Sequence, residues 1–185
     1  MKVLGISGSL RRDSYNTKLL STAGELMRYD AEVELWSGLK EIPPYDEDDD
    51  VQPAPAAVAA LRDAIAGADA VLIATPEYNS SVPGQLKNAV DWVSRPLATN
   101  PLRNKPVAVV GASTGAFGAV WAQAELRKVL AATGARVVDA EVAVGHAPTK
   151  FDEDGHLEDE AIREQLAETV DVLLAEAGVR LLVAV

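Results

Sequence analysis

Residues 68–94 read ADAVLIATPEYNSSVPGQLKNAVDWVS, and they contain a strong indication of the fold. The apolar run 68–75 predicts a buried strand, two prolines interrupt the pattern in 76–83, and 84–94 predicts a helix. A strand that is apolar along its whole length must be covered on both faces. The stretch therefore indicates a sheet that lies between layers of helices.

The same alternation of strand and helix extends in both directions from this stretch. We expect strands at 2–7, 31–36, 68–75, 105–111 and 136–144. We expect helices at 16–29, 56–66, 84–94, 118–133 and 158–176. Strands that alternate with helices imply right-handed crossovers and a parallel sheet. The sequence thus predicts an α/β fold, with a five-stranded parallel sheet and helices on both faces, in a single domain over residues 1–185.

The composition excludes several kinds of chemistry. The 185 residues include no cysteine and only two histidines, His146 and His156. The absence of cysteine excludes thiolate metal sites, disulfides and cysteine nucleophiles. Two histidines are too few for most multi-histidine metal sites and leave little choice for a catalytic triad. We interpret the acidic segments 46–50 and 152–155 as a solvated loop and a turn, with a calcium site as the weaker alternative. No metal site is expected.

The net charge of −11 argues against two classes of partner. An acidic surface without a basic stripe repels nucleic acid and anionic membranes. No apolar run approaches the roughly 20 residues that span a bilayer. The N-terminal stretch also lacks the apolar core of a signal peptide. We therefore expect a cytoplasmic protein with no nucleic-acid or membrane partner.

Three loops follow the expected first, third and fourth strands, at the sheet edge where ligands bind in this class of fold. The first loop, 8–17, combines serines, an asparagine and arginines at a helix N-terminus, which suits a phosphate. Its candidate contacts are Ser9, Arg11, Ser14 and Asn16. The alternative is a capped helix start, with Ser14 as the N-cap and surface arginines. The loop is neither a Walker A motif nor a GxGxxG fingerprint.

The second and third loops offer groups for a flat ligand. In 76–84 two prolines stiffen the backbone, Tyr78 offers a ring, and Asn79 offers donors and acceptors. In 112–118 small residues permit a close approach to the backbone. Each loop also has a simpler interpretation, as an ordinary turn between a strand and a helix.

Two motifs carry a resemblance to a known family. They are GSLR at 8–11 with Ser14 and Asn16, and PEYNSSVPG at 76–84 followed by Leu86, Lys87, Asn88, Ala89, Asp91 and Trp92. With the spacing between them, these motifs resemble the NADPH-dependent FMN reductase family, which includes bacterial chromate and quinone reductases. The resemblance covers roughly residues 1–175 and implies a flavodoxin-like fold that binds FMN non-covalently.

The resemblance also implies the residues of an FMN site. The phosphate would be held by Ser9, Arg11, Ser14, Asn16 and the amide of Thr17. The isoalloxazine and ribityl chain would be bordered by Pro76, Glu77, Tyr78 and Asn79, with Ser113 and Gly115 on the other side. The third loop has fewer glycines than is common in the family. The family commonly forms dimers or tetramers, so residues 84–94 and 118–133 would supply interface surface, although Trp92 and Trp121 also suit core packing.

The implied function is electron transfer from a reduced nicotinamide, NADPH or NADH, through FMN to a small acceptor. The acceptor would be a quinone, an azo compound, a metal ion or a free flavin, and the kinetics would be ping-pong. The flavin carries the chemistry, so no catalytic side chain is expected, and backbone N–H groups near Asn79 or Gly115 would stabilise its reduced form. The alternative is a non-enzymatic flavodoxin-like electron carrier or a flavin-binding regulatory protein. A phosphate-handling hydrolase lacks an evident nucleophile.

Overall fold

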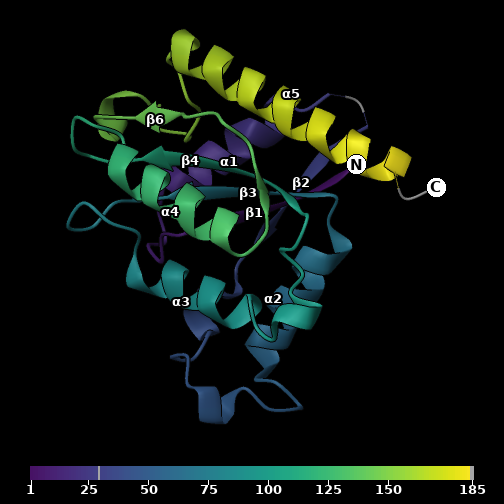
Figure 1. Cartoon of the computed structure of the whole chain (residues 1–185). Helices are drawn as coiled ribbons and strands as arrows, with labels where there is room; N and C mark the ends of the chain where they lie inside the picture. The colour runs from purple at the N-terminus through teal and green to yellow at the C-terminus, as the bar shows by residue number, and fades with distance from the viewer. Residues whose placement is uncertain (29, 184–185) are drawn as a thin grey trace.

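The computed structural model describes residues 1–28 and 30–183 and contains one parallel sheet (Figure 1). The strands are β1 (Lys2–Ser7), β2 (Glu32–Trp36), β3 (Ala70–Thr75), β4 (Pro106–Ala112), β5 (Arg136–Val137) and β6 (Ala143–Val144). The helices are α1 (Tyr15–Leu26), α2 (Ala56–Gly67), α3 (Gly84–Val93), α4 (Val120–Ala132) and α5 (Glu160–Val183). The strand order is β2-β1-β3-β4-β5, and β6 also pairs with β4. The predicted α/β fold class is confirmed.

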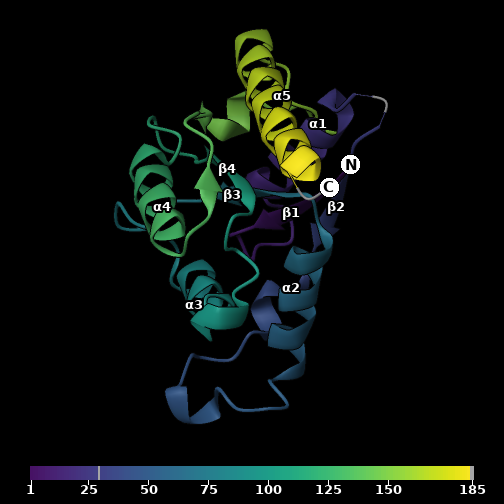
Figure 2. The ribbon, with the colours of Figure 1, turned by 45° about the vertical axis from the view of Figure 1, so that its right-hand side comes forward.

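Helices cover both faces of the sheet, in three layers (Figure 2). Side chains alternate across β3, so that Leu72 packs toward α1 and α5 while Ile73 packs toward α2, α3 and α4. Every residue of β3 and β4 is buried. Burying a side chain such as Leu or Val stabilises the fold by roughly 1.5–3 kcal/mol. The two apolar layers therefore hold the carboxyl ends of the central strands at one edge.

The predicted fifth strand, 136–144, is wrong in one respect, because it is interrupted. Arg136 lies opposite Pro106 in the register of β5, whereas Ala143 lies opposite Gly111 in β6, so the outer segment carries two extra residues. The Arg127 guanidinium donates to the carbonyl of Ala140, between the two short strands, at 3.1 Å. Local periodicity reveals neither this contact nor the change of register.

The other boundaries agree with the sequence to within a few residues, except at the end of the chain. The helix predicted over 158–176 continues as α5 to Val183. The helix predicted over 16–29 begins one residue earlier and ends at Leu26, and Tyr29 lies outside the described residues. Gly134, at a φ of 88°, follows α4 as a left-handed C-terminal residue. None of the described helices is both long and apolar enough to cross a membrane.

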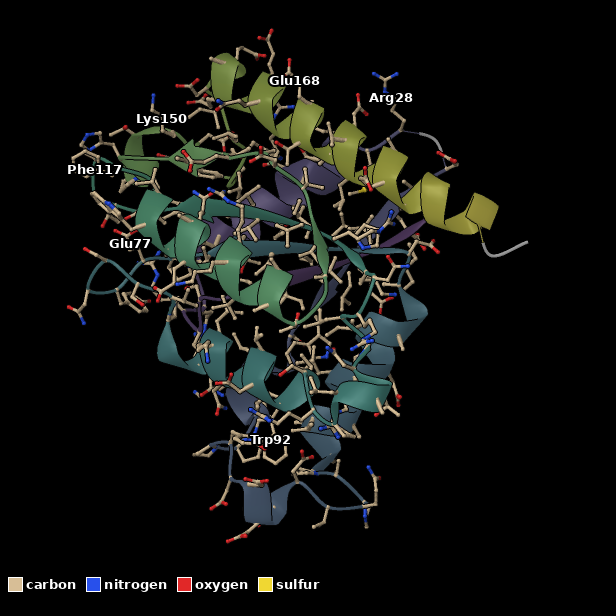
Figure 3. The ribbon with its side chains drawn as sticks, viewed as in Figure 1. Arg28, Glu77, Trp92, Phe117, Lys150 and Glu168 are labelled. Atoms are coloured by element: carbon tan, nitrogen blue, oxygen red, sulfur yellow. The ribbon has the colours of Figure 1, made fainter. Side chains whose placement is uncertain are left out.

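The acidic segment 46–50 is only partly the solvated loop that we expected. Asp46–Asp49 are exposed, but Asp50 pairs with Arg62 of α2 at 3.1 Å, with only about 15% of either side chain exposed. The Arg62 guanidinium also donates to the carbonyl of Trp92 at 2.9 Å. Trp92 itself is buried and donates from Nε1 to the carbonyl of Pro43 at 2.8 Å, in the lower part of Figure 3. The interpretation of Trp92 as a core residue is confirmed.

Candidate functional site

The site lies at the carboxyl ends of β1, β3 and β4, where the strand order reverses. β1 connects outward to β2 on one side and pairs with β3 on the other, and a crevice forms at such a switch point. The backbone N–H of Gly8 donates to the carbonyl of Ala74 at 2.8 Å, which joins the first loop to the end of β3. A Cβ at Gly8 would lie 2.7 Å from Cδ2 of Leu86 and 3.2 Å from Cδ of Pro76. The glycine therefore permits two loops to meet.

A cleft of about 230 Å³ opens between the three loops. Eight of the eleven predicted site residues line it: Ser9, Arg11, Ser14, Asn16, Pro76, Glu77, Tyr78 and Ser113. Thr17, Asn79 and Gly115 are not in its lining. The structure thus gathers most of the predicted set from three segments that are far apart in the sequence.

The N-terminus of α1 forms one end of the cleft. Ser14 is the N-cap, and its Oγ accepts from the backbone N–H groups of Asn16 at 3.2 Å and Thr17 at 3.4 Å. The alternative interpretation of Ser14 as a cap is therefore confirmed. Within residues 1–28 and 30–183, five backbone N–H groups of this segment find no acceptor, namely those of Leu10, Arg12, Asp13, Ser14 and Tyr15. A helix start with free donors is a favourable place for an anion.

The positive charges around this end are fewer than the sequence suggested. Lys18 pairs with Asp13 at 2.7 Å, and hydrogen bonding from Lys18 lowers the pKa of the Asp13 carboxyl. Arg11 donates to the carbonyl of Asp13, and its guanidinium carbon lies 5.5 Å from the centre of the Tyr15 ring. Neither Arg11 nor Arg12 has a carboxylate partner within the described part of the chain. These two guanidinium groups remain for an anionic ligand.

The second loop contains a tight hairpin turn. Tyr78 and Ser81 exchange backbone hydrogen bonds of 3.2 and 3.1 Å across Asn79 and Ser80, whose φ angles are 53° and 58°. Positive φ at both central residues is the geometry of a type I′ turn. The turn holds the Tyr78 ring 57% exposed at the rim of the cleft. The backbone N–H of Asn79 has no acceptor in residues 1–28 and 30–183.

Two carboxylates fix this loop to α4. Glu77, at the left-hand edge in Figure 3, accepts from the backbone N–H of Ala122 at 3.0 Å, in the first turn of α4. Glu125 accepts from Oγ of Ser81 at 2.6 Å and from the N–H of Val82 at 3.4 Å. These hydrogen bonds, from Ser81 first and Val82 second, lower the pKa of the Glu125 carboxyl. Glu77 thus has a structural partner in addition to its place in the cleft.

The third loop is held by contacts that the sequence did not reveal. The side-chain amide of Asn16 donates to the carbonyl of Ala112 at 2.9 Å and accepts from its N–H at 3.0 Å. Asn16 is 3% exposed and so connects α1 to the end of β4. The N–H of Gly115 already donates to Oγ of Ser113 at 3.1 Å, whereas that of Thr114 finds no acceptor in the described residues. Of these two amides, Thr114 is the one left free.

Three lining residues were missed by sequence reasoning. They are Tyr15, Ala112 and Thr114. Each is a direct neighbour of a residue that we did identify. None of the three belongs to a distinctive motif. Their position next to a predicted site residue in the sequence was therefore the only feature that could have identified them.

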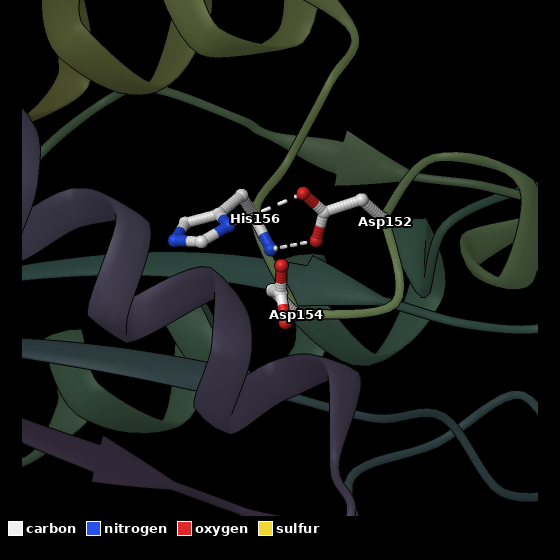
Figure 4. Close-up of side chains that lie close together, drawn as sticks. All are labelled: Asp152, Asp154 and His156. Atoms are coloured by element: carbon white, nitrogen blue, oxygen red, sulfur yellow. Dashed lines mark hydrogen bonds and ion pairs between the residues drawn. The ribbon is translucent and has the colours of Figure 1, made fainter.

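The described residues contain one cluster of metal-ligand type, and none of its members lines the cleft (Figure 4). It consists of Asp152, Asp154 and His156. The Asp152 carboxylate accepts from the backbone N–H of His156 at 2.7 Å and approaches its Nδ1 at 3.2 Å, and the backbone bond lowers the pKa of the carboxyl. Gly155, at a φ of 94°, completes a turn here. These contacts describe the turn that we expected at 152–155.

Comparison with known families identifies the chain over most of its length. Residues 1–149 match the family described as NADPH-dependent FMN reductase. The chain belongs to the NADPH-dependent FMN reductase family. The match includes all three loops of the cleft, and the resemblance drawn from the two motifs is confirmed.

Individual relatives agree with this family. The chain is 43% identical to an NAD(P)H-dependent FMN reductase of Pseudomonas aeruginosa over 174 residues, which cover 94% of the chain and 93% of the relative. It is 41% identical to a quinone reductase of Escherichia coli K12 over 140 residues, which cover 75% and 74% of the two chains. The solved structure of FerB, a flavoenzyme NAD(P)H:(acceptor) oxidoreductase from Paracoccus denitrificans, superposes with a TM-score of 0.83. That structure is 36% identical to this chain, with 96% and 97% of the two chains covered.

Membership in the NADPH-dependent FMN reductase family decides between the two classes of function left open by the sequence. The protein is an oxidoreductase with FMN as its cofactor and a reduced nicotinamide as electron donor. The alternative of a non-enzymatic carrier or regulatory protein is wrong. The fold is flavodoxin-like.

Proposed function

We propose that the cleft binds FMN with its phosphate at the N-terminus of α1 and its ring between the turn at Tyr78 and the loop at Ser113. The main support for this assignment is the set of backbone N–H groups without an acceptor at the start of α1, next to Arg11. A phosphate there gains several N–H hydrogen bonds, the positive end of the helix dipole and a guanidinium. On an acidic protein, such a local site works because screening over roughly 8–10 Å weakens the distant carboxylates.

The chain's own residues bind and orient the cofactor. Ser9 and Arg11 line the end of the cleft that would hold the phosphate, and Tyr78 lies at the rim, where its ring would border the isoalloxazine. The N–H groups of Asn79 and Thr114 are available to stabilise negative charge on the ring system. No side chain of the cleft needs to act as an acid or a base. When bound, FMN supplies hydride acceptance from the nicotinamide and electron delivery to the acceptor.

We infer ping-pong kinetics and a small acceptor. Because one cleft lined by the three loops would hold the flavin, donor and acceptor would reach it in turn. Relatives named for quinone reduction include the quinone reductase of E. coli and a 2-hydroxy-1,4-benzoquinone reductase of a Burkholderia species, which is 37% identical over 172 residues. We therefore propose a quinone as the preferred acceptor, with azo compounds, metal ions and free flavin as further candidates.

We also propose that the active form is a homodimer or a homotetramer. The cleft, at about 230 Å³, is smaller than the roughly 300–1,000 Å³ common for ligand pockets. Three large aromatic side chains are exposed beside it: Tyr78 at 57%, Phe117 at 64% and Trp121 at 47%. The rings of Phe117 and Trp121 meet edge to face at 5.0 Å between centroids. A second copy that packed on these rings would enclose the cofactor and bury apolar surface.

The test is an anaerobic absorption spectrum of protein that has been incubated with FMN and desalted. We expect flavin bands that bleach when NADPH is added and return when benzoquinone follows. Absence of the bands would contradict the FMN assignment, and bands that persist with both NADPH and NADH would contradict the reductase activity. Steady-state rates with varied NADPH and benzoquinone should give parallel double-reciprocal lines, and converging lines would overturn the ping-pong proposal.

A further inference from the structure

The segment that follows β6, residues 145–147, packs against the third loop of the cleft. The backbone N–H of Ala147 donates to the carbonyl of Ser113 at 3.0 Å. The backbone N–H of His146 donates to the carbonyl of Gly115 at 2.9 Å. Two alternate carbonyls of the third loop are therefore occupied on the side that faces this segment.

These two hydrogen bonds also set the direction of two backbone donors. In a trans peptide, the C=O of one residue and the N–H of the next point to opposite sides. The carbonyl of Ser113 points toward the segment 145–147, so the N–H of Thr114 points away from it. The same holds for the carbonyl of Gly115 and the N–H of Ala116. Neither N–H finds an acceptor within the described chain, and Thr114 lines the cleft whereas none of 145–147 does.

The close approach of the two loops requires glycine at position 145. A Cβ at Gly145 would lie 2.1 Å from the carbonyl oxygen of Ala116 and 2.8 Å from its carbonyl carbon. Both are backbone atoms, which cannot rotate away as the end of a long side chain can. A second glycine of the third loop, Gly118, is packed as closely, since its Cβ would lie 2.4 Å from the carbonyl carbon of Ala143. A side chain at position 145 would therefore displace the third loop.

The backbone of the segment is itself in an uncommon conformation. His146 has a φ of 48°, in the left-handed region that residues other than glycine adopt only where the surrounding structure holds them. The N–H of Thr149 donates to its carbonyl at 2.9 Å, while its own N–H is bound to the third loop. Such conformations concentrate at functional sites. The segment is therefore held in one geometry next to the cleft.

We propose that Gly145 is a positioning residue, which lets the third loop turn the N–H groups of Thr114 and Ala116 toward the ring of FMN. This inference rests on the proposed function, since it needs the ring to lie at this loop. Two N–H groups that point the same way stabilise negative charge. Reduction adds electrons to the ring, so the reduced form gains more from these donors than the oxidised form does. Gly145 would thereby raise the affinity for reduced FMN relative to oxidised FMN.

The test compares the affinities of Gly145→Ala for the two forms of FMN with those of the unaltered protein. Oxidised and reduced FMN are titrated calorimetrically under anaerobic conditions. We expect the dissociation constant of reduced FMN to rise at least tenfold more than that of oxidised FMN. A tenfold change in this ratio lowers the two-electron potential of the bound flavin by about 30 mV. A purely structural role of Gly145 would weaken both forms by the same factor, and an unchanged ratio would overturn the proposal.

Two variants serve as controls. Gly67→Ala adds the same methyl group at the end of α2, where no atom lies within 4 Å of the new Cβ, so both affinities should stay unchanged. His146→Asn removes the imidazole but keeps the backbone N–H and a residue type that tolerates positive φ. Its ratio of affinities should also stay unchanged. A change as large as that in Gly145→Ala would assign the effect to the imidazole and overturn the proposal.

A measurement on the unaltered protein is independent of how well Gly145→Ala folds. Backbone hydrogen exchange, followed by NMR, should show the N–H of Ala147 protected with and without FMN. The N–H groups of Thr114 and Ala116 should exchange at least tenfold more slowly when FMN is bound.

The exchange measurement also separates this inference from the proposed function. If FMN binds but leaves the exchange of Thr114 and Ala116 unchanged, the inference fails and the proposed function stands. If FMN slows both but neither NADPH nor NADH bleaches the flavin, the proposed function fails and the inference stands. Absence of FMN binding would overturn both.

Discussion

Two loops of this protein have the same topology and opposite electrostatics. The loops β1–α1 and β4–α4 each lead from a central strand to a helix at the same edge of the sheet. At the start of α1, five backbone donors lack an acceptor in the described residues, and Arg11 and Arg12 form no salt bridge with a described carboxylate. At the start of α4, the carboxylate of Glu77 already accepts from Ala122, and Glu125 lies one turn further along.

The difference supports the helix at which we propose that the FMN phosphate binds. A helix N-terminus attracts an anion through its free N–H groups and its dipole. In α4 a carboxylate of this chain already fills that role, and a further anion would be repelled by Glu77 and Glu125. At the start of α1, no carboxylate of the described residues accepts from the backbone N–H groups. The orientation proposed for FMN follows, with the phosphate at α1 and the ring toward the loop before α4.

The largest expected effect comes from removing a positive charge from the β1–α1 loop. Arg11→Ala should weaken FMN binding by about 1.5–3 kcal/mol, or roughly 10- to 150-fold, because a charge-assisted hydrogen bond is lost. The FMN affinity of Arg11→Lys should lie between those of the unaltered protein and Arg11→Ala, since lysine keeps the charge but cannot bind a phosphate through two parallel hydrogen bonds. Fluorescence titration with FMN measures the affinity. Arg103→Ala is the control, and an unchanged affinity in Arg11→Ala would remove this residue from the site.

A smaller effect should follow from removing the carboxylate at the start of α4. Glu77→Ala removes the acceptor for the N–H of Ala122, so the free energy of unfolding should fall by about 1 kcal/mol, the usual scale of a lost helix cap. Glu77→Gln keeps an acceptor and loses only the charge, so it should cost less. Urea denaturation of all three proteins measures the effect. Equal stabilities would show that Glu77 does not stabilise the start of α4.

The smallest effect should appear as a pH dependence at the turn beside α4. Ser81 lowers the pKa of Glu125 below its ordinary value of 4.5 in the folded protein, so the stabilisation is present above that value and is lost as the pH falls through the folded pKa. Removing Ser81 in Ser81→Ala should therefore cost stability at about pH 7 and progressively less below about pH 4.5. Thermal unfolding at several pH values measures it. A difference that stays constant down to about pH 2 would contradict this assignment.

Most of the fold was predictable because it depends on local patterns. β1 was predicted with its observed bounds, and the apolar runs of β3 and β4 and the N-cap at Ser14 are also signals within a few residues of chain. The interruption between β5 and β6 was not predictable, because it is a change of register against β4 that the periodicity of 136–144 does not show. Of the candidate site, the two motifs supplied most of the residues, but the hydrogen bonds of Asn16 with Ala112 cross 96 positions of sequence.

The sequence by itself determined the class of fold and the cofactor, and it predicted three loops that line the cleft. It did so because strand and helix periods, the serines and arginines of 8–17 and the family motifs are all contained in short segments. Only the tertiary structure decided that Glu77 caps α4 and that Lys18 is neutralised by Asp13. These contacts depend on the strand order β2-β1-β3-β4, which places loops side by side irrespective of their separation along the chain.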